Sequence, residues 1–192
     1  EKVINKNGVF VEEGGELWGN VYIFTPQNAK GSFMTNLIGE YECRIDDKGR
    51  IILPAGLKKQ IPPEAEERFV INRGFETCLS LYPMNEWRKT IDEVNRLNMY
   101  NRKNRNFARY FSRGASELVL DGSNRLLLPK TLLEYAGIQR DVILFAFSNR
   151  IEVWAKDKYE NLMNEEPEDF ALLAEEVMGK QPVNREDPEN VP

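Results

Sequence analysis

A nine-residue pattern occurs twice in this chain, and this repeat restricts the possible folds more than any other feature of the sequence. Residues 46–54 and residues 121–129 both read Asp-x-x-x-Arg-x-x-Leu-Pro, and the second copy begins 75 residues after the first. The same separation relates further residues on either side of the pattern, namely Gly39 to Gly114 and Leu57 to Leu132. Such regular spacing indicates a duplicated unit.

A second block of the repeat follows downstream. Residues 79–82 align with residues 151–154, at a separation of 72 because the intervening loop is three residues shorter in the second copy. Trp87 and Tyr159 keep that separation. A unit of about 45 residues has too little apolar core to be stable alone. We therefore expect the two units to pack into one domain with pseudo-two-fold symmetry.

Each unit is expected to contain two short β-hairpins, each followed by a helix, so the fold class is α+β and mainly β. In the first unit we expect strands at residues 39–45, 50–53, 69–72 and 78–82, with helices that start at Pro54 and Pro83. Proline fits the first helical turn because its missing N–H has no partner there. In the second unit we expect strands at residues 117–120, 126–128, 142–147 and 151–154, with helices at residues 129–136 and 156–163.

The chain divides into five segments. Residues 1–36 are an N-terminal extension or a cloning remnant, residues 37–94 the first repeat, residues 95–113 a basic helical linker, residues 114–163 the second repeat, and residues 164–192 an acidic, largely disordered tail. The formal net charge is -5, but residues 161–192 alone carry nine acidic and two basic side chains. Residues 38–160 are mildly basic, so the average charge does not exclude nucleic acid as a partner of the repeats.

Several classes of function are excluded by composition. The chain has no histidine and two cysteines, Cys43 and Cys78, which are not in a CxxC arrangement. Common zinc sites and histidine-dependent nucleophiles are therefore excluded, and we expect neither an enzyme nor a metal or cofactor site. The longest apolar run near the start, residues 21–24, is too short to cross a membrane. These features predict a cytoplasmic protein.

The two Asp-x-x-x-Arg turns are the main candidate binding site. Asp46 and Asp121 can each accept backbone N–H bonds and close their turn, while Arg50 and Arg125 emerge at its base. An arginine there can engage a phosphate or a guanine edge. The alternative is that each Asp and Arg simply pair and rigidify the turn. Lys48 in the first turn is a further candidate for DNA contact.

A basic stretch between the repeats adds phosphate-binding candidates. From residue 95 to residue 113 there is no acidic residue, and Arg102, Arg105 and Arg109 would share one face of a helix. Phe107 and Tyr110 would face elsewhere, towards the core. A solvated basic face is the alternative interpretation. The remaining candidates are Arg113 at the end of this stretch and Arg73 near the tip of the second hairpin.

The repeat region of this chain resembles the MraZ family, whose members regulate the division and cell-wall gene cluster. The resemblance rests on residues 39–42 (GEYE), 46–50 (DDKGR) and 53–54 (LP), on residues 73–75 (RGF) before 78–83 (CLSLYP), and on residues 114–115 (GA) before the second turn. It covers about residues 37–160. It implies a double swapped-hairpin barrel related to AbrB, ring-like homo-oligomers, and repression through short repeated operator sites in double-stranded DNA.

The resemblance also implies which residues contact DNA. The family's motif maps onto Lys48-Gly49-Arg50 and onto Arg125. The second copy departs from the motif, because Asn124 replaces the usual glycine and Ser123 replaces a basic residue. Asparagine tolerates a left-handed backbone, so the turn can persist, but we expect its contact with DNA to be weaker.

The predicted function is therefore that of a sequence-specific, nucleoid-associated repressor that binds as an oligomer. The main alternative is an oligomeric scaffold with the same barrel, whose acidic tail recruits protein partners. An AbrB-like antitoxin is disfavoured because such proteins resemble a single unit used as a homodimer, whereas this chain carries both units.

Overall fold

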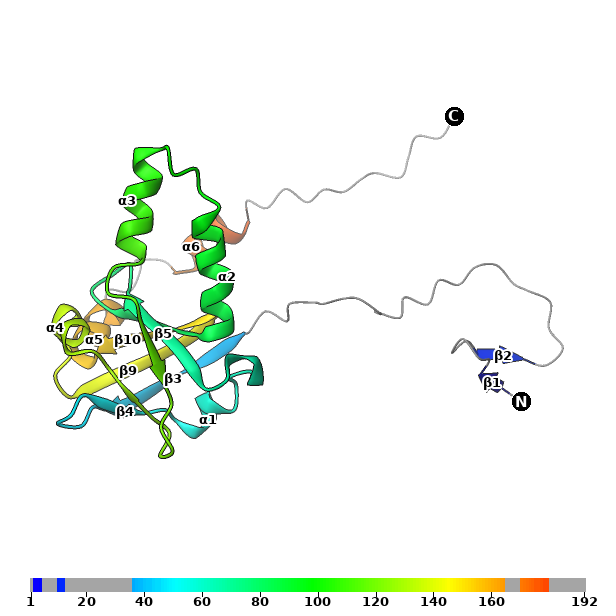
Figure 1. Cartoon of the computed structure of the whole chain (residues 1–192), viewed down its shortest axis with the longest axis horizontal. Helices are drawn as coiled ribbons and strands as arrows, with labels where there is room; N and C mark the ends of the chain where they lie inside the picture. The colour runs from blue at the N-terminus through cyan, green and yellow to red at the C-terminus, as the bar shows by residue number, and fades with distance from the viewer. Residues whose placement is uncertain (1, 5–9, 13–35, 165–169, 180–192) are drawn as a thin grey trace. The chain divides into compact units, whose positions relative to one another are not determined.

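The structure is a computed structural model, and it describes residues 2–4, 10–12, 36–164 and 170–179. The chain forms two compact structural units, residues 1–33 and residues 34–192, which are not the two repeats. In the first unit, β1 (Lys2–Ile4) pairs antiparallel with β2 (Phe10–Glu12). The second unit contains both repeats, and Figure 1 shows its helices and strands in chain order.

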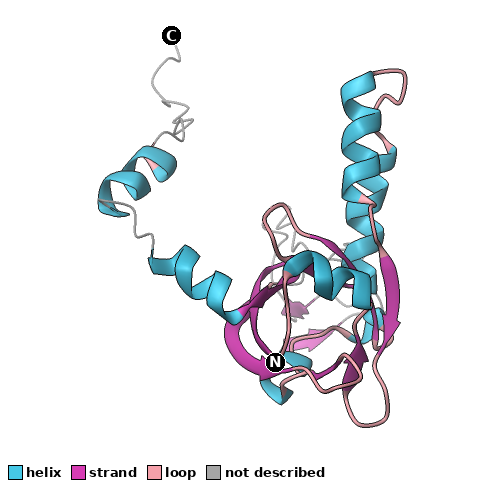
Figure 2. Cartoon of the chain, turned by 90° about the vertical axis from the view of Figure 1, so that its left-hand side faces the viewer, coloured by secondary structure: helices cyan, strands magenta, loops and turns pink. Residues whose placement is uncertain are grey.

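The second structural unit has a mixed α/β fold with an antiparallel six-stranded sheet. The strands are β3 (Leu37–Arg44), β5 (Arg68–Arg73), β6 (Leu79–Pro83), β7 (Ser116–Val119), β9 (Asp141–Ser148) and β10 (Arg150–Ala155). Their order in the sheet is β3-β9-β10-β6-β5-β7. A separate two-stranded ribbon joins β4 (Arg50–Ile52) to β8 (Arg125–Leu127). Figure 2 shows the strands curving around a common centre.

Strand pairing interleaves the two repeats. The first strand of each repeat pairs with the third strand of the other, as β3 with β9 and β7 with β5. The second strands pair with each other, as β4 with β8, and so do the fourth, as β6 with β10. Within one repeat, the hairpins β5–β6 and β9–β10 are paired, and a single antiparallel bridge joins Ile45 to Ile51. The strands of the two repeats therefore interleave within one compact unit, residues 34–192.

The helices of the second structural unit include α1 (Ala55–Lys58), α2 (Met84–Asn95), α3 (Arg102–Phe111), α4 (Lys130–Ala136), α5 (Lys156–Asn164) and α6 (Phe170–Met178). Four helices, α1, α2, α4 and α5, lie where the repeat predicts them, whereas α3 lies in the basic linker and α6 in the acidic tail. Pro54, Pro83 and Pro129 were expected inside the first turn, but each precedes its helix by one residue and has an extended ψ near 130–144°. Gly137 ends α4 with a φ of 71°, as a left-handed cap requires.

The core is built from equivalent residues of both repeats. Leu57 and Leu132 are fully buried, and so are Ile51 and Leu126 on the two ribbon strands. All four belong to one continuous cluster, which also takes in Phe69 from β5. Because both repeats contribute to this one cluster, neither repeat can bury its apolar side chains without the other.

No helix in the described part of the chain is long and apolar enough to cross a membrane. Within the predicted acidic tail, residues 170–178 form α6. The remaining tail residues, 165–169 and 180–192, lie outside the described part of the chain, as does most of the predicted N-terminal extension.

Candidate nucleic-acid interface

The first Asp-x-x-x-Arg turn is closed by its aspartate. Asp46 Oδ1 accepts hydrogen bonds from the backbone N–H groups of Lys48 and Arg50, both at 2.9 Å. The other carboxylate oxygen, Oδ2, accepts from Arg50 Nε at 2.7 Å and lies 2.6 Å from Arg50 Nη2. Gly49 adopts a φ of +82°, which glycine tolerates because it lacks a Cβ. The predicted turn chemistry is confirmed.

The second turn repeats this bonding pattern atom for atom. Asp121 Oδ1 accepts from the backbone N–H groups of Ser123 and Arg125, and Oδ2 accepts from Arg125 Nε at 2.9 Å. Asn124 takes the place of Gly49 with a φ of +58°, so the prediction that asparagine preserves the turn is confirmed. Its side-chain oxygen accepts a hydrogen bond from Lys58 Nζ of the first repeat.

The β4–β8 ribbon brings the two turns onto one surface. The carbonyl of Gly49 accepts from Leu128 N, and the carbonyl of Asn124 accepts from Leu53 N, both at 2.9 Å. Each left-handed turn residue is thus bonded to the other repeat. This reciprocal pairing holds the bases of the two turns at opposite ends of one short antiparallel ribbon.

The outer face of this ribbon alternates arginines with apolar side chains. Arg50 lies opposite Leu127, and Ile52 lies opposite Arg125, while the intervening residues Ile51 and Leu126 point into the core. Ile52 and Leu127 are 61% and 58% exposed. Neither of these apolar side chains was predicted from the sequence to belong to the site. Their exposure could have been predicted, because a strand with one buried face exposes every second residue.

Both arginines are held by carboxylates but remain at the surface. The side chains of Arg50 and Arg125 are 28% and 31% exposed. Each uses Nε and Nη2 towards its aspartate, so its other N–H groups stay available to a ligand. The turn-rigidifying interpretation is therefore correct as geometry, and it does not remove the arginines from binding. An aspartate that orients a guanidinium fixes the direction in which the remaining donors point.

The pKa values reflect this pairing. The Arg50 side-chain hydrogen bond, helped by the backbone N–H groups, lowers the pKa of Asp46 from 3.8 to about 2. The equivalent bond from Arg125 lowers the pKa of Asp121. The pKa of Arg50 is raised, first by Asp46 and also by the charge of Asp121 in the other turn. Both ion pairs therefore stay charged at neutral pH, and the two turns influence one another electrostatically.

The lysines near the ribbon are placed differently from each other. Lys48 is exposed in the first turn, and no ion pair to its side chain is found among the described residues. Lys58 instead forms an ion pair with Glu67 at 3.0 Å in addition to its bond to Asn124. Lys48 is consequently the better placed of the two for contact with a phosphate.

The basic helix α3 does not lie beside the ribbon. Figure 1 shows α3 at the top of the view and β4 at the bottom, so a single chain does not bring Arg102, Arg105 or Arg109 to the two turns. Arg105 also has a local structural role, because its Nη1 donates to the carbonyls of Met99 and Tyr100 at 2.8 Å. These arginines form a second, separate basic surface.

The aromatic side chains of α3 contradict the expectation that they face the core. Phe107 and Tyr110 are 43% and 72% exposed. The side chain that packs inward is Phe111, whose ring stacks on Trp87 of α2 at a centroid distance of 5.6 Å. The expectation was wrong because Phe111 makes the stacking contact with α2, while Phe107 and Tyr110 lie at the surface.

Arg73 lies at the end of β5, away from the ribbon. Its guanidinium lies over the ring of Tyr135, 4.1 Å from the centroid, and its Nε is buried without a hydrogen-bond partner. Arg113, which follows α3, lines one cavity together with Arg73 and Tyr135. The structure therefore separates these two arginines from the turns as well.

One cluster has the composition of a metal site. Glu76, Cys78 and Glu152 place their ligand atoms within 4.8 Å of one another. Burial raises the pKa of the Cys78 thiol to about 12, so its proton is harder to displace than that of an exposed thiol. Glu152 already accepts a hydrogen bond from the indole N–H of Trp154. This donor set does not favour a metal ion.

Comparison with known proteins identifies relatives of the whole repeat region. The sequence profile of a family described as "MraZ protein, putative antitoxin-like" matches residues 37–110 and again residues 111–179, in agreement with the duplication. A protein of Christiangramia forsetii named transcriptional regulator MraZ is 47% identical over 76% of this chain and 95% of its own length. Proteins of the same name from Flavobacterium psychrophilum and Cytophaga hutchinsonii are 44% and 39% identical, over 94% and 93% of their lengths.

Proposed function

This chain belongs to the MraZ family, and on that premise we propose that it is a DNA-binding transcriptional regulator that acts as an oligomer on repeated sites. Its relatives are named transcriptional regulators, which supports a regulatory role. The resemblance described above further supports repression of the division and cell-wall gene cluster, at operator DNA in the nucleoid.

The observation that carries this proposal is the ribbon with its two matched turns. Arg50 and Arg125 are fixed in equivalent positions on one surface, each with guanidinium N–H groups that the aspartate does not use. A planar guanidinium held in this way can donate two bonds to the edge of a guanine. Lys48 adds a cation for the DNA backbone.

The exposed apolar residues of the ribbon fit the same surface. Ile52 and Leu127 lie between the arginines, where they can contact a thymine methyl group or exclude water from the arginine contacts. We place Arg50, Arg125, Lys48 and Gly49 at the interface with DNA. Asp46 and Asp121 orient the arginines and do not contact the bases.

We assign the domain to the swapped-hairpin barrel class that the resemblance implies. The pairing of strands between the repeats supports this assignment, because the first strand of each repeat pairs with the third strand of the other. One chain presents a single pair of turns, which gives a small interface. Several subunits on several sites would raise the effective concentration of each turn near DNA, so assembly would supply much of the affinity.

The basic helix α3 is proposed as a second, weaker DNA-contacting surface. Arg102 and Arg109 are exposed, and residues 95–113 contain no acidic side chain. Because α3 and the ribbon lie at opposite ends of the sheet, both would reach one duplex only through different subunits. Replacing Arg102 and Arg109 with alanine should then lower the salt dependence of binding without changing sequence preference.

The test is a fluorescence titration of the full chain with duplex DNA from upstream of its own gene, at several salt concentrations. We expect affinity to fall by about 0.9 log units per log unit of salt for each phosphate contacted. The Arg50→Ala/Arg125→Ala double variant should bind about 25-fold more weakly or worse, and should lose its preference over unrelated DNA.

Arg88→Ala provides a matched control. Arg88 is an exposed cation on α2, which Figure 1 places at the end of the sheet opposite the ribbon. This variant loses the same charge as a single turn variant and should retain DNA affinity within about twofold. Unchanged affinity in the double variant would remove the turns from the interface. Stable assemblies that bind no DNA at low salt would instead support the scaffold alternative.

A further inference from the structure

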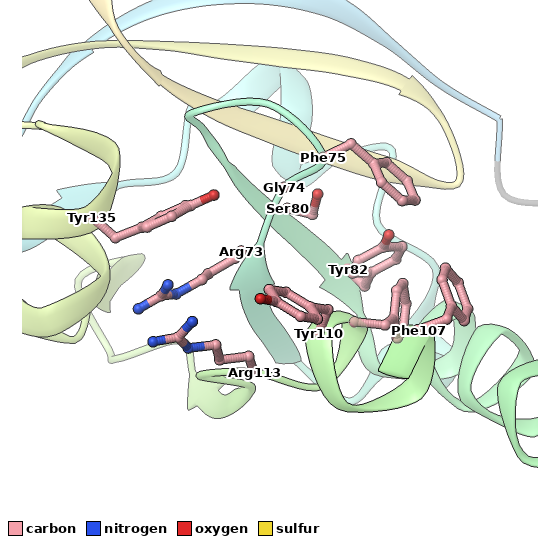
Figure 3. A pocket seen from close by; sticks show the side chains of 10 residues that line it. Arg73, Gly74, Phe75, Ser80, Tyr82, Phe107, Tyr110, Arg113 and Tyr135 are labelled. Atoms are coloured by element: carbon pink, nitrogen blue, oxygen red, sulfur yellow. The ribbon is translucent and has the colours of Figure 1, made fainter. Parts of the chain in front are cut away.

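A cavity with aromatic walls lies at the junction of the β5–β6 hairpin, α3 and α4, and none of the residues that line it belongs to the ribbon. Its volume is about 470 Å³, which suits a small molecule. Figure 3 shows the rings of Tyr82, Phe107 and Tyr110 on one side of the cavity and two arginines beneath Tyr135 on the other. Aromatic walls of this kind can pack against a planar ring.

The charge of the two arginines in this cavity is not balanced by a neighbouring carboxylate. Arg73 and Arg113 extend next to each other in Figure 3, and no ion pair to either is found among the described residues. None of the residues that line the cavity is acidic. The ring of Tyr135 lies 4.1 Å from the guanidinium carbon of Arg73, whose Nε is buried without a hydrogen-bond partner. These donors favour an anionic occupant, which would accept hydrogen bonds from both side chains.

The equivalent position in the other repeat shows that the sheet does not require an arginine at position 73. Arg73 pairs with Leu79 of β6. The counterpart of Leu79 in the second repeat is Ile151 of β10, which pairs with Ala146 of β9. Ala146 is therefore the counterpart of Arg73, and it is buried in the shared core cluster. Because the same strand pairing forms with alanine, the arginine is a feature of the cavity and not of the fold.

The counterparts of the other two side chains are likewise different. At the separation of 75 residues, Arg113 corresponds to Ile38. Tyr135 corresponds to Gln60 at the same separation. The Gln60 amide accepts a hydrogen bond from the backbone N–H of Ile38 at 2.9 Å and donates one to its carbonyl at 3.0 Å. In the first repeat this position is thus closed by local bonds, whereas in the second it carries an arginine and an aromatic ring. The difference indicates a ligand site on one side of the duplicated fold.

We propose that this cavity binds a small molecule that combines a planar aromatic ring with an anionic group, either a carboxylate or a phosphate. The ring would lie among the aromatic side chains of the cavity, and the anionic group would accept hydrogen bonds from Arg73 and Arg113. Both arginines would then bind a small anion in place of the DNA phosphate predicted from sequence. The site shares no residue with the ribbon, so the inference goes beyond the proposed function and does not depend on it.

The experiment titrates the full chain with anilinonaphthalene sulfonate, a dye whose aromatic rings and sulfonate combine these two features. Its fluorescence rises when it leaves water, so the titration measures its affinity for the cavity. Arg113→Ala should weaken binding about tenfold, because it removes charge-assisted hydrogen bonds to the anionic group. Tyr110→Ala should weaken binding about threefold or more, because it removes one ring from the aromatic wall. Both side chains are exposed, so neither substitution opens a hole in the core.

Each cavity variant has a matched control outside the cavity lining. Arg109→Ala loses the same charge from α3, and Tyr100→Ala loses the same ring from the loop before α3. Both side chains are exposed, and both controls should keep the affinity for the dye within about twofold of the wild type. Circular dichroism of the four variants should match the wild type, which separates lost binding from lost folding.

Competition identifies the anionic group. Naphthoate carries an aromatic ring and a carboxylate, and adenosine monophosphate carries an aromatic base and a phosphate. Displacement of the dye by naphthoate would support a carboxylate ligand, and displacement by adenosine monophosphate would support a phosphate ligand. The proposal is overturned if the wild type does not bind the dye, if both cavity variants bind it as the wild type does, or if neither competitor displaces it.

Discussion

The two turns of the ribbon are equal in structure and differ in their charged side chains. Both have the same aspartate-to-backbone bonds and the same aspartate–arginine pair, and both have a left-handed residue before the arginine. The first turn carries Asp47 and Lys48, whereas the second has Gly122 and Ser123 at those positions. The two turns therefore share the residues that close the turn and differ in whether a lysine is present. The comparison separates residues that build the turn from a residue that only serves binding.

The largest expected effect is on the free energy of unfolding, and measuring it tests whether the two repeats form one core. Leu57→Ala and Leu132→Ala should each lower the free energy of unfolding by about 2–5 kcal/mol, because each removes a fully buried side chain from the shared cluster. Urea unfolding at one protein concentration, followed by tryptophan fluorescence and circular dichroism, should show a single coincident transition for both variants. Separate transitions for the two repeats would contradict the interleaved core.

A smaller effect should distinguish the left-handed residues of the two turns. Gly49→Ala places a Cβ on a residue with a φ of +82° and should cost about 1–2 kcal/mol of stability. Asn124→Gly should cost less than Gly49→Ala, because glycine accepts the same backbone conformation and only the exposed hydrogen bond from Lys58 is lost. Thermal unfolding of both variants would measure the difference. Equal losses would show that backbone strain is not what distinguishes the two positions.

Exchanging the residues at positions 48 and 123 should exchange the contributions of the two turns to phosphate binding. Lys48→Ser should reduce the salt slope of DNA binding by about one unit, and Ser123→Lys should increase it by a similar amount. The double exchange should restore the wild-type slope. DNA titrations over a range of salt concentrations would measure all three variants, and a slope that ignores both substitutions would exclude this position from phosphate contact.

The smallest effect concerns pH. The pKa of Asp46 is lowered to about 2 from 3.8, mainly by the Arg50 side chain, so the folded protein favours the charged form. The resulting stabilisation is complete above pH 3.8 and is lost as the pH falls from 3.8 towards 2. Asp46→Asn should therefore flatten the pH dependence of the melting temperature in this range.

Asp121→Asn is the comparison for that measurement, because the pKa of Asp121 is lowered by the equivalent bond. Both variants should change the curve in the same direction. A variant curve parallel to that of the wild type between pH 4 and pH 2 would show that the turn aspartates do not control acid stability.

Much of the local structure could be predicted from sequence because its causes are local. Asp46 closes its turn with N–H groups two and four residues away, and Asn124 tolerates the same backbone as Gly49. The order of strands and helices followed from one repeat applied twice. The helix starts were misplaced by one residue, since proline suits both the first helical turn and the extended residue before it.

The sequence by itself determined that two equivalent Asp–Arg turns exist and that one core must serve both repeats. Only the tertiary structure decided that β4 pairs with β8, which places Arg50 and Arg125 on one ribbon and α3 at the other end of the sheet. It also decided that Phe107 and Tyr110 remain exposed beside Arg113. The physical reason is the separation of the interacting residues along the chain. Turn closure depends on neighbouring residues, whereas strand pairing and helix packing join residues far apart in the sequence.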